Sequence, residues 1–274
     1  MSVSLGSLIP RTVAAQGLSV LDPFVPWLLA ALLLAAGGLA WYWRRELGAA
    51  ALHPPARLSW RAAGALMSAA ALLFGVLAWG VMAGQETALG QLIANRDGAA
   101  LLWAQGLSSH GMRALALDLT DMGSVRILMP LVVLVALWLL YRRQRFLAVA
   151  WFVGCASNSL LLRALKNVFE RTRPPHAADV IASGYSFPSG HAAGAAMVIG
   201  LLTWLLHDRV PPPWRAPLIL LGGLLIAAIA ASRVLLQAHF LSDVLAGLLL
   251  GAFSLLFTIA VTEHARHMND RDFN

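Results

Sequence analysis

Long apolar stretches alternate with short polar and basic segments along most of the chain. A helix needs roughly 17–25 mostly apolar residues to cross about 30 Å of hydrocarbon. Seven stretches meet this condition: residues 24–43, 62–84, 125–141, 146–165, 190–206, 216–233 and 241–262. The pattern therefore predicts an all-α, polytopic membrane protein, because a spanning helix satisfies its own backbone hydrogen bonds.

The composition supports a membrane location. Of the 274 residues, 59% are hydrophobic and only 12% are charged, which is more apolar surface than a soluble domain of this size can bury. The single cysteine, Cys155, lies in an apolar stretch and excludes a disulfide framework.

The net charge of +7 comes from arginines clustered between apolar runs rather than along one soluble face. This is typical of cytoplasmic loops and argues against a nucleic-acid partner. Residues 44–61 hold four arginines, and Arg142, Arg143 and Arg145 follow the third stretch. We expect both segments to face the cytoplasm, with the N-terminus and residues 85–124 outside. The predicted location is the bacterial inner membrane.

The outer segment 85–124 has apolar residues at helical spacing, interrupted by the turn-like sequences NRDG and SSHG. It predicts short helices on the membrane surface, and packing against the bundle is an equally consistent alternative. The expected organisation is an N-terminal region with one extra span (1–61), a membrane core that includes this segment (62–262) and a cytoplasmic tail (263–274).

One predicted outer loop, residues 163–186, breaks the charge rule. It contains Arg163, Lys166, Arg171 and Arg173, and cations on the unfavoured side suggest an anionic substrate. Polar residues gather in this loop and in two later segments. The three segments read KNVFERTRP (166–174), SFPSGH (186–191) and SRVLLQAHFLSD (232–243). Two spans separate the second from the third, so all three can meet at one membrane face.

The second and third segments carry two histidines with different expected roles. Pro188 and Gly190 mark a turn, and His191 opens an apolar helical run whose first backbone amides can bind an anion. His191 can also deliver a proton to a departing oxygen near neutral pH. Asp243 follows His239 by four residues. On one helical turn, its carboxylate would orient the imidazole and leave the other nitrogen as a free base.

Arg233 lies six residues before His239 and can offer a forked pair of donors to phosphate oxygens. Arg163 and Arg171 are not assigned to the site, because an arginine near a helix end can equally extend to the lipid headgroups.

Together, the three segments resemble the signature of the type 2 phosphatidic acid phosphatase superfamily. Lys166 is followed after six residues by Arg173 and Pro174, and residues 188–191 read PSGH. The third part, SR, five residues, H, three residues, D, is met by Ser232, Arg233, His239 and Asp243. The resemblance covers roughly residues 62–262 and leaves residues 24–43 outside the six-span plan of that family.

The resemblance implies a fold and a chemistry. His239 would attack phosphorus to form a phosphohistidine, Asp243 would position it, and His191 would protonate the leaving oxygen. The family works without a metal or other cofactor. The residues expected to hold the phosphate are Lys166, Arg173, Ser189, Arg233 and the Gly190 amide.

The expected function is hydrolysis of a lipid phosphomonoester or diphosphate at the periplasmic face. Undecaprenyl diphosphate, phosphatidic acid, phosphatidylglycerol phosphate and lipid A all fit these residues. Two alternatives stay open: a lipid phosphotransferase that passes the phosphoryl group to another acceptor, and a non-hydrolytic lipid-binding or transport protein. The expected partners are the lipid substrate and the surrounding membrane lipids, and the sequence does not determine the oligomeric state.

Overall fold

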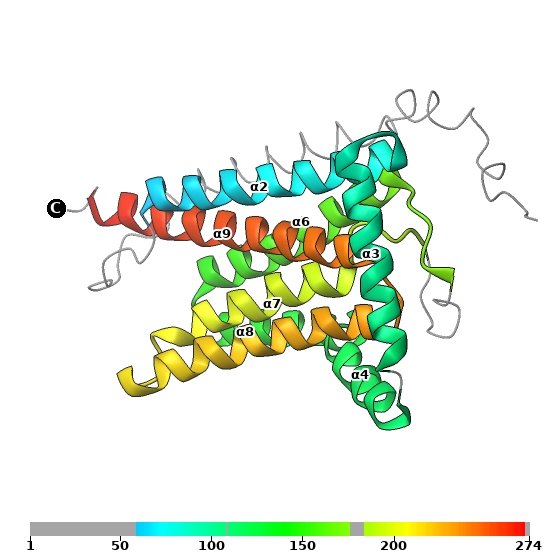
Figure 1. Ribbon diagram of the computed structural model, residues 1–274. Coiled ribbons are helices and arrows are strands. Elements are labelled where there is room, and N and C mark those ends of the chain that lie inside the picture. The colour runs from blue at the N-terminus through cyan, green and yellow to red at the C-terminus, as the bar shows by residue number, and fades with distance from the viewer. Residues whose placement is uncertain (1–58, 108, 176–183, 272–274) are drawn as a thin grey trace, which may run out of the picture. The chain divides into compact units, whose positions relative to one another are not determined.

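A computed structural model describes residues 59–107, 109–175 and 184–271, which form helices joined by short turns (Figure 1). The predicted extra span, residues 24–43, lies outside the described residues. The helices are α2 (Trp60–Ala83), the 3-10 helix η2 (Gly84–Glu86), α3 (Ala88–Gly106), α4 (His110–Met122), α5 (Val125–Tyr141), α6 (Arg145–Phe169), α7 (Gly190–His207), α8 (Pro212–Leu235) and α9 (Leu241–Arg271).

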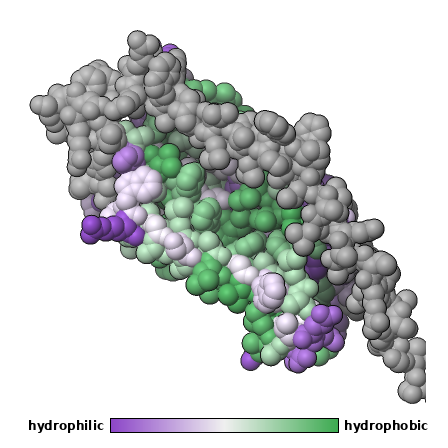
Figure 2. All heavy atoms as spheres, turned by 90° about the horizontal axis from the view of Figure 1, so that it is seen from above, coloured by the Kyte–Doolittle hydropathy of each residue, from purple (hydrophilic) through white to green (hydrophobic). Residues whose placement is uncertain are grey.

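The described residues contain six helical segments that are long and apolar enough to cross a membrane. This confirms the predicted all-α fold, and the protein is an integral membrane protein. α4 and α5 are separated only by Gly123 and Ser124, and together they form one candidate span. Figure 2 shows apolar side chains over the middle of the visible face and hydrophilic ones toward its ends. Leu72, Leu134 and Leu220 are more than 60% exposed, as expected for side chains that face lipid.

Three helices begin at residues that prefer the N-cap position. The hydroxyls of Ser59, Thr87 and Ser109 accept hydrogen bonds from backbone amides in the first turns of α2, α3 and α4, which satisfies donors that have no partner within the helix. The turn predicted at NRDG (95–98) is wrong, because these residues lie within α3. The turn predicted at SSHG falls at the break between α3 and α4.

α7 and α9 form a very close helix pair. A side-chain carbon added at Gly247 would lie 2.5 Å from the carbonyl oxygen of Ser189, and one added at Gly251 would lie 2.6 Å from that of Ala193. Only glycine allows this approach, which is typical of small residues at helix contacts in membranes. The contact fixes the start of α7 against the start of α9.

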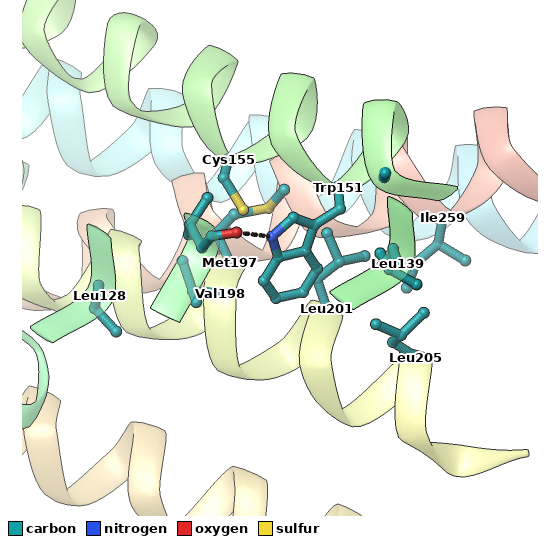
Figure 3. Packing of buried hydrophobic residues seen from close by; sticks show 11 residues of the cluster. Leu128, Leu139, Trp151, Cys155, Met197, Val198, Leu201, Leu205 and Ile259 are labelled. Atoms are coloured by element: carbon teal, nitrogen blue, oxygen red, sulfur yellow. Dashed lines mark hydrogen bonds between the residues drawn. The ribbon is translucent and has the colours of Figure 1, made fainter. Parts of the chain in front are cut away.

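The largest group of buried apolar residues joins α5, α6, α7 and α9 (Figure 3). Trp151 of α6 lies in this cluster beside Met197 and Leu201 of α7, and its indole nitrogen donates to the carbonyl oxygen of Val132, 2.9 Å away. The hydrogen bond satisfies the one polar group of a buried tryptophan. It also joins α6 to α5 at a defined position within the apolar core.

α3 and α4, which form most of the predicted surface segment, pack against the bundle. α3 contacts α2, α8 and α9, and α4 contacts α8. In Figure 1, α3 runs across the ends of α2 and α9 rather than along them. At the other end of the bundle, the Trp60 indole donates to His264 of α9, and Arg209 lies over the ring of Trp138. Among the described residues, α3 therefore adds a helical layer at one end of the bundle.

Candidate active site

The three polar segments meet at the end of the bundle next to α3. Lys166 lies in the last turn of α6, and His191 lies in the first turn of α7. Arg233 lies in the last turn of α8, and Asp243 lies in the first turn of α9. The structure thus brings together residues from four helix ends, which a shared site requires.

His239 lies in the turn between α8 and α9, not on the helix that carries Asp243. The backbone amides of Ala238 and His239 donate to the carbonyl oxygen of Arg233, and Gln237 has a positive φ of 52°. The expectation that His239 and Asp243 share one helical turn is therefore wrong in its local geometry. The two side chains still meet, because the tight turn returns His239 toward the start of α9.

The imidazole of His239 is only 2% exposed and has a different neighbour at each nitrogen. Nδ1 lies 3.5 Å from Oδ2 of Asp243, and Nε2 lies 3.1 Å from Nη1 of Arg173. A guanidinium can only donate, so Nε2 must carry the lone pair in this arrangement. The proton is then on Nδ1 and faces the carboxylate. This is the tautomer that a nucleophilic Nε2 requires.

Burial lowers the pKa of His239 from 6.5 to about 4, and the carboxylate of Asp243 opposes this shift only in part. Nearby Arg173 and Arg233 also disfavour a protonated ring. The imidazole is therefore neutral at physiological pH, and its lone pair is available for reaction.

Three cationic side chains surround the two histidines. Arg173 donates to the carbonyl oxygens of Gly184 and Ala238 at 2.9 and 2.8 Å, and burial lowers its pKa while Asp243 opposes that effect. Lys166 donates to the carbonyl oxygen of Tyr185. The Arg233 guanidinium is 3% exposed and donates to the hydroxyl of Thr120 at 2.6 Å.

Two buried donors near the cations are not satisfied by the part of the chain that the structure describes. They are Nε of Arg233 and the hydroxyl of Ser189. Unpaired buried polar groups are rare in folded proteins and call for an explanation. Gly190 and His191 open α7 directly after Ser189, so their amides have no acceptor within the helix. These donors lie at the same end of the bundle, and a bound anion would accept hydrogen bonds from them.

His191 lies against Gly123, at the junction of α4 and α5. A side-chain carbon at Gly123 would come within 3.5 Å of the His191 side chain. His191 is also close enough to Arg233 for the guanidinium charge to act on its ring. All eight predicted site residues thus lie at one end of the bundle.

Several residues that the sequence did not assign to the site hold Asp243. Its carboxylate accepts hydrogen bonds from Ser186, from the amide of Phe240 at 3.0 Å and from Arg171 at 2.5 Å. Arg171 also pairs with Asp97 of α3 at 2.8 Å. The unexpected charge of the 163–186 loop was a signal for Arg171. Asp97 had no such signal, because it lies in the turn-like sequence NRDG, where an acid usually faces solvent.

Among residues 59–107, 109–175 and 184–271, no three His, Cys, Asp or Glu side chains form a group that could hold a metal ion. The charges gathered here are positive, apart from carboxylates that already accept several hydrogen bonds. The donor set suits an anion better than a cation.

Comparison with known proteins shows which family the chain is similar to. A model of the PAP2 superfamily matches residues 145–266. The chain is 31% identical over 135 residues to phosphatidylglycerophosphatase B of Bacillus subtilis, a match that covers 48% of this chain and 66% of that protein. It is 32% identical over 149 residues to decaprenylphosphoryl-5-phosphoribose phosphatase of Mycobacterium tuberculosis, covering 52% of this chain and 76% of that protein.

The fold agrees with a solved structure. The crystal structure of a transmembrane PAP2-type phosphatidylglycerolphosphate phosphatase from Bacillus subtilis superposes with a TM-score of 0.64 at 25% identity. The superposition covers 75% of this chain and 96% of that one. The chain belongs to the PAP2 superfamily.

Proposed function

We propose that this protein is a lipid phosphatase that uses His239 as its nucleophile. The observation that carries the proposal is the environment of His239, whose buried and neutral ring is oriented by Asp243 and faces a cluster of cations. This arrangement supports attack on a phosphoryl group, because phosphoryl transfer needs a positioned nucleophile and compensation of the charge on the phosphoryl oxygens. The catalytic unit that we propose is the core of residues 62–262, which includes the 85–124 segment.

In the first step, Nε2 of His239 attacks phosphorus, and the bond from phosphorus to the lipid oxygen breaks. Protonated His191 gives its proton to that oxygen and becomes neutral, so the lipid leaves as an alcohol, or as a monophosphate if the substrate is a diphosphate. Lys166, Arg173 and Arg233 compensate the charge of the phosphoryl oxygens, together with the Ser189 hydroxyl and the Gly190 amide. Arg173 contacts Nε2 and would turn to the phosphate when a substrate binds.

In the second step, His191 takes a proton from a water molecule that attacks the phosphohistidine. The bond between phosphorus and Nε2 breaks, inorganic phosphate is released, and His239 regains its lone pair. Asp243 stabilises the imidazole through Nδ1 in both steps. We propose that no metal ion is required, because three cationic side chains can supply the positive charge that phosphoryl transfer needs.

A lipid substrate agrees with the position of the site at one end of six candidate spans. The names of the two relatives, phosphatidylglycerophosphatase B and decaprenylphosphoryl-5-phosphoribose phosphatase, also point to lipid phosphates. The other end of the bundle carries Arg142, Arg143 and Arg145. By the positive-inside rule, this charge favours a cytoplasmic location for that end. We therefore propose that the site faces the periplasm in a bacterial inner membrane.

Phosphate release by the detergent-purified protein tests the proposal. The substrates would be phosphatidylglycerol phosphate, phosphatidic acid, undecaprenyl diphosphate and lipid A, with and without a chelator. We expect release from at least one lipid, unchanged by the chelator. His239→Ala should lower the rate at least about 10³-fold, the scale seen when a nucleophile is removed.

The matched control is His207→Ala, which removes a histidine beside an aspartate at the other end of α7. Its rate should stay within about twofold of the wild-type rate. Full activity of folded His239→Ala protein would refute the mechanism. Transfer of labelled phosphate to a second lipid, with little free phosphate, would show a phosphotransferase instead.

A further inference from the structure

A charged network outside the phosphate-binding groups links Asp243 to α3. Asp97 of α3 is 2% exposed and lies outside the region that the superfamily model matches. It accepts two hydrogen bonds from Ser242, at 2.8 Å from the amide and 2.6 Å from the hydroxyl. It also accepts one from Arg171 at 2.8 Å. Such a buried carboxylate is tolerated only when it is paired and hydrogen-bonded in this way.

Arg171 connects two carboxylates with its two terminal nitrogens. Nη2 donates to Asp97, while Nη1 donates to Oδ1 of Asp243 at 2.5 Å and to the hydroxyl of Ser242 at 2.8 Å. The guanidinium carbon lies 4.2 Å from the centre of the Phe240 ring, which restricts the tilt of its plane. Because both terminal nitrogens already have protein acceptors, Arg171 is poorly placed to bind phosphate.

The two oxygens of Asp243 have different partners. Oδ1 accepts from Arg171, whereas Oδ2 accepts from Ser186 and the Phe240 amide and faces Nδ1 of His239. A carboxylate held at one oxygen by a rigid guanidinium cannot rotate freely about its Cβ–Cγ bond. The direction in which Oδ2 faces His239 therefore depends on the position of the Arg171 guanidinium. The orientation of that guanidinium depends in turn on its hydrogen bond to Asp97.

We propose that Asp97 and Arg171 are positioning residues for the phosphoryl-transfer reaction, which hold the Asp243 carboxylate in the orientation that aims His239 at phosphorus. The proposal rests on the proposed function and extends it to α3. Both oxygens of Asp97 and both terminal nitrogens of Arg171 already have protein partners, so the loss of either residue should lower kcat and leave KM nearly unchanged. A misplacement of reacting groups by about 1 Å can cost roughly 10²-fold in rate.

The test is a double-mutant cycle on the purified full-length protein. Asp97→Asn keeps the size of the side chain and removes its charge. We expect it to lower kcat about 10- to 100-fold with KM within twofold. If Asp97 acts through Asp243, Asp97→Asn should lower kcat less than twofold in an Asp243→Asn background, because that background has no carboxylate left to orient. The rate of phosphohistidine formation in a single turnover should fall by the same factor as kcat.

Asp118→Asn is the matched control, because Asp118 is an exposed acid on the neighbouring helix α4. It should leave kcat and KM unchanged. If Asp97→Asn does not yield folded protein, Arg171→Lys provides the same cycle, since lysine keeps the charge and cannot bridge both carboxylates. Arg113→Lys, at an exposed position of α4, is its control.

Two results would overturn the inference: a kcat within twofold of the wild-type value, or an equal loss in the wild-type and Asp243→Asn backgrounds. The second result would mean that α3 only stabilises the fold. These outcomes are separate from failure of the proposed function, which would appear as activity in His239→Ala. An inactive His239→Ala protein combined with additive losses at Asp97 would refute this inference alone.

Discussion

Two histidine–aspartate pairs lie near opposite ends of α7, and the same two side-chain types are in very different environments. His239 and Asp243 are 2% and 0% exposed, whereas His207 and Asp208 are 22% and 39% exposed. The buried pair is held by further hydrogen bonds from Ser186 and Arg171 and faces three cations. The exposed pair lies at the end where charged groups reach solvent.

The arginines at the two ends differ in the same way. Arg209 lies over Trp138 and donates to the side-chain oxygen of Gln144 at 2.7 Å, an arrangement typical of a long side chain at the membrane boundary. Arg233 is almost completely buried and keeps one donor that no described protein atom satisfies. Nearly complete burial of the charged side chains therefore distinguishes the candidate site, because each residue type also occurs at the other end, where Nε of Arg215 near the start of α8 is likewise unsatisfied.

After the two histidine replacements, the largest difference between the two ends should appear when each arginine is replaced by lysine. Arg233→Lys removes the forked guanidinium and its Nε donor, so kcat/KM should fall about 10²-fold, as for the loss of one donor to a transition state. The kcat/KM of Arg209→Lys should stay within about twofold of the wild-type value. Steady-state phosphate release by the two purified variants measures both effects, and equal losses would remove the distinction.

A smaller effect is expected from the glycines that set helix distances. Gly247→Ala places a carbon 2.5 Å from the Ser189 carbonyl oxygen, so α7 and α9 must separate. The free energy of unfolding should decrease by about 1–3 kcal/mol. Gly223 of α8 has no heavy atom within 4 Å of the same added carbon, and Gly223→Ala should be neutral or slightly stabilising. Thermal unfolding in detergent compares the two, and equal stability would contradict the close packing.

The most gradual effect concerns pH. His239 has a folded-state pKa of about 4 and an ordinary value of 6.5. Between these values the unfolded chain binds a proton that the folded protein does not. The free energy of unfolding should therefore fall as pH decreases from about 6.5 to about 4, by at most about 1.4 kcal/mol per pH unit. The unfolding midpoints of wild-type and His239→Ala protein, measured across this pH range, give the slope. The same pH dependence in both proteins would contradict a buried neutral imidazole.

Much of the fold could be predicted from periodicity and length alone. Five of the six candidate spans of the described region follow the predicted stretches within a few residues, because a run of apolar residues has few stable alternatives to a membrane helix. The remaining span contains the predicted stretch 125–141 but begins earlier, at His110, because it includes α4. The turn predicted at NRDG was wrong, since local turn propensity was overridden inside α3. There Asp97 is buried and accepts hydrogen bonds from Ser242 and Arg171, and sequence propensities carry no information about such partners.

The candidate site was predictable to a similar extent. Its eight residues could be named because their spacing matches a known signature and an even number of spans returns the chain to one face. The structure brings them to one end of the bundle, and their catalytic roles stay a proposal. Arg171, Asp97, Ser186 and Ser242 could not be assigned, because their importance depends on contacts between segments up to 145 residues apart.

The sequence by itself determined that the chain enters the membrane as a bundle of helices, and which residue types meet at one face. These properties depend on hydrophobicity, length and the parity of the spans, which are local or additive. Only the tertiary structure decided which side chains are buried, which nitrogen of His239 faces Asp243 and that α3 reaches Asp243 through Arg171. Burial, tautomer and carboxylate orientation depend on atoms from several helices at once.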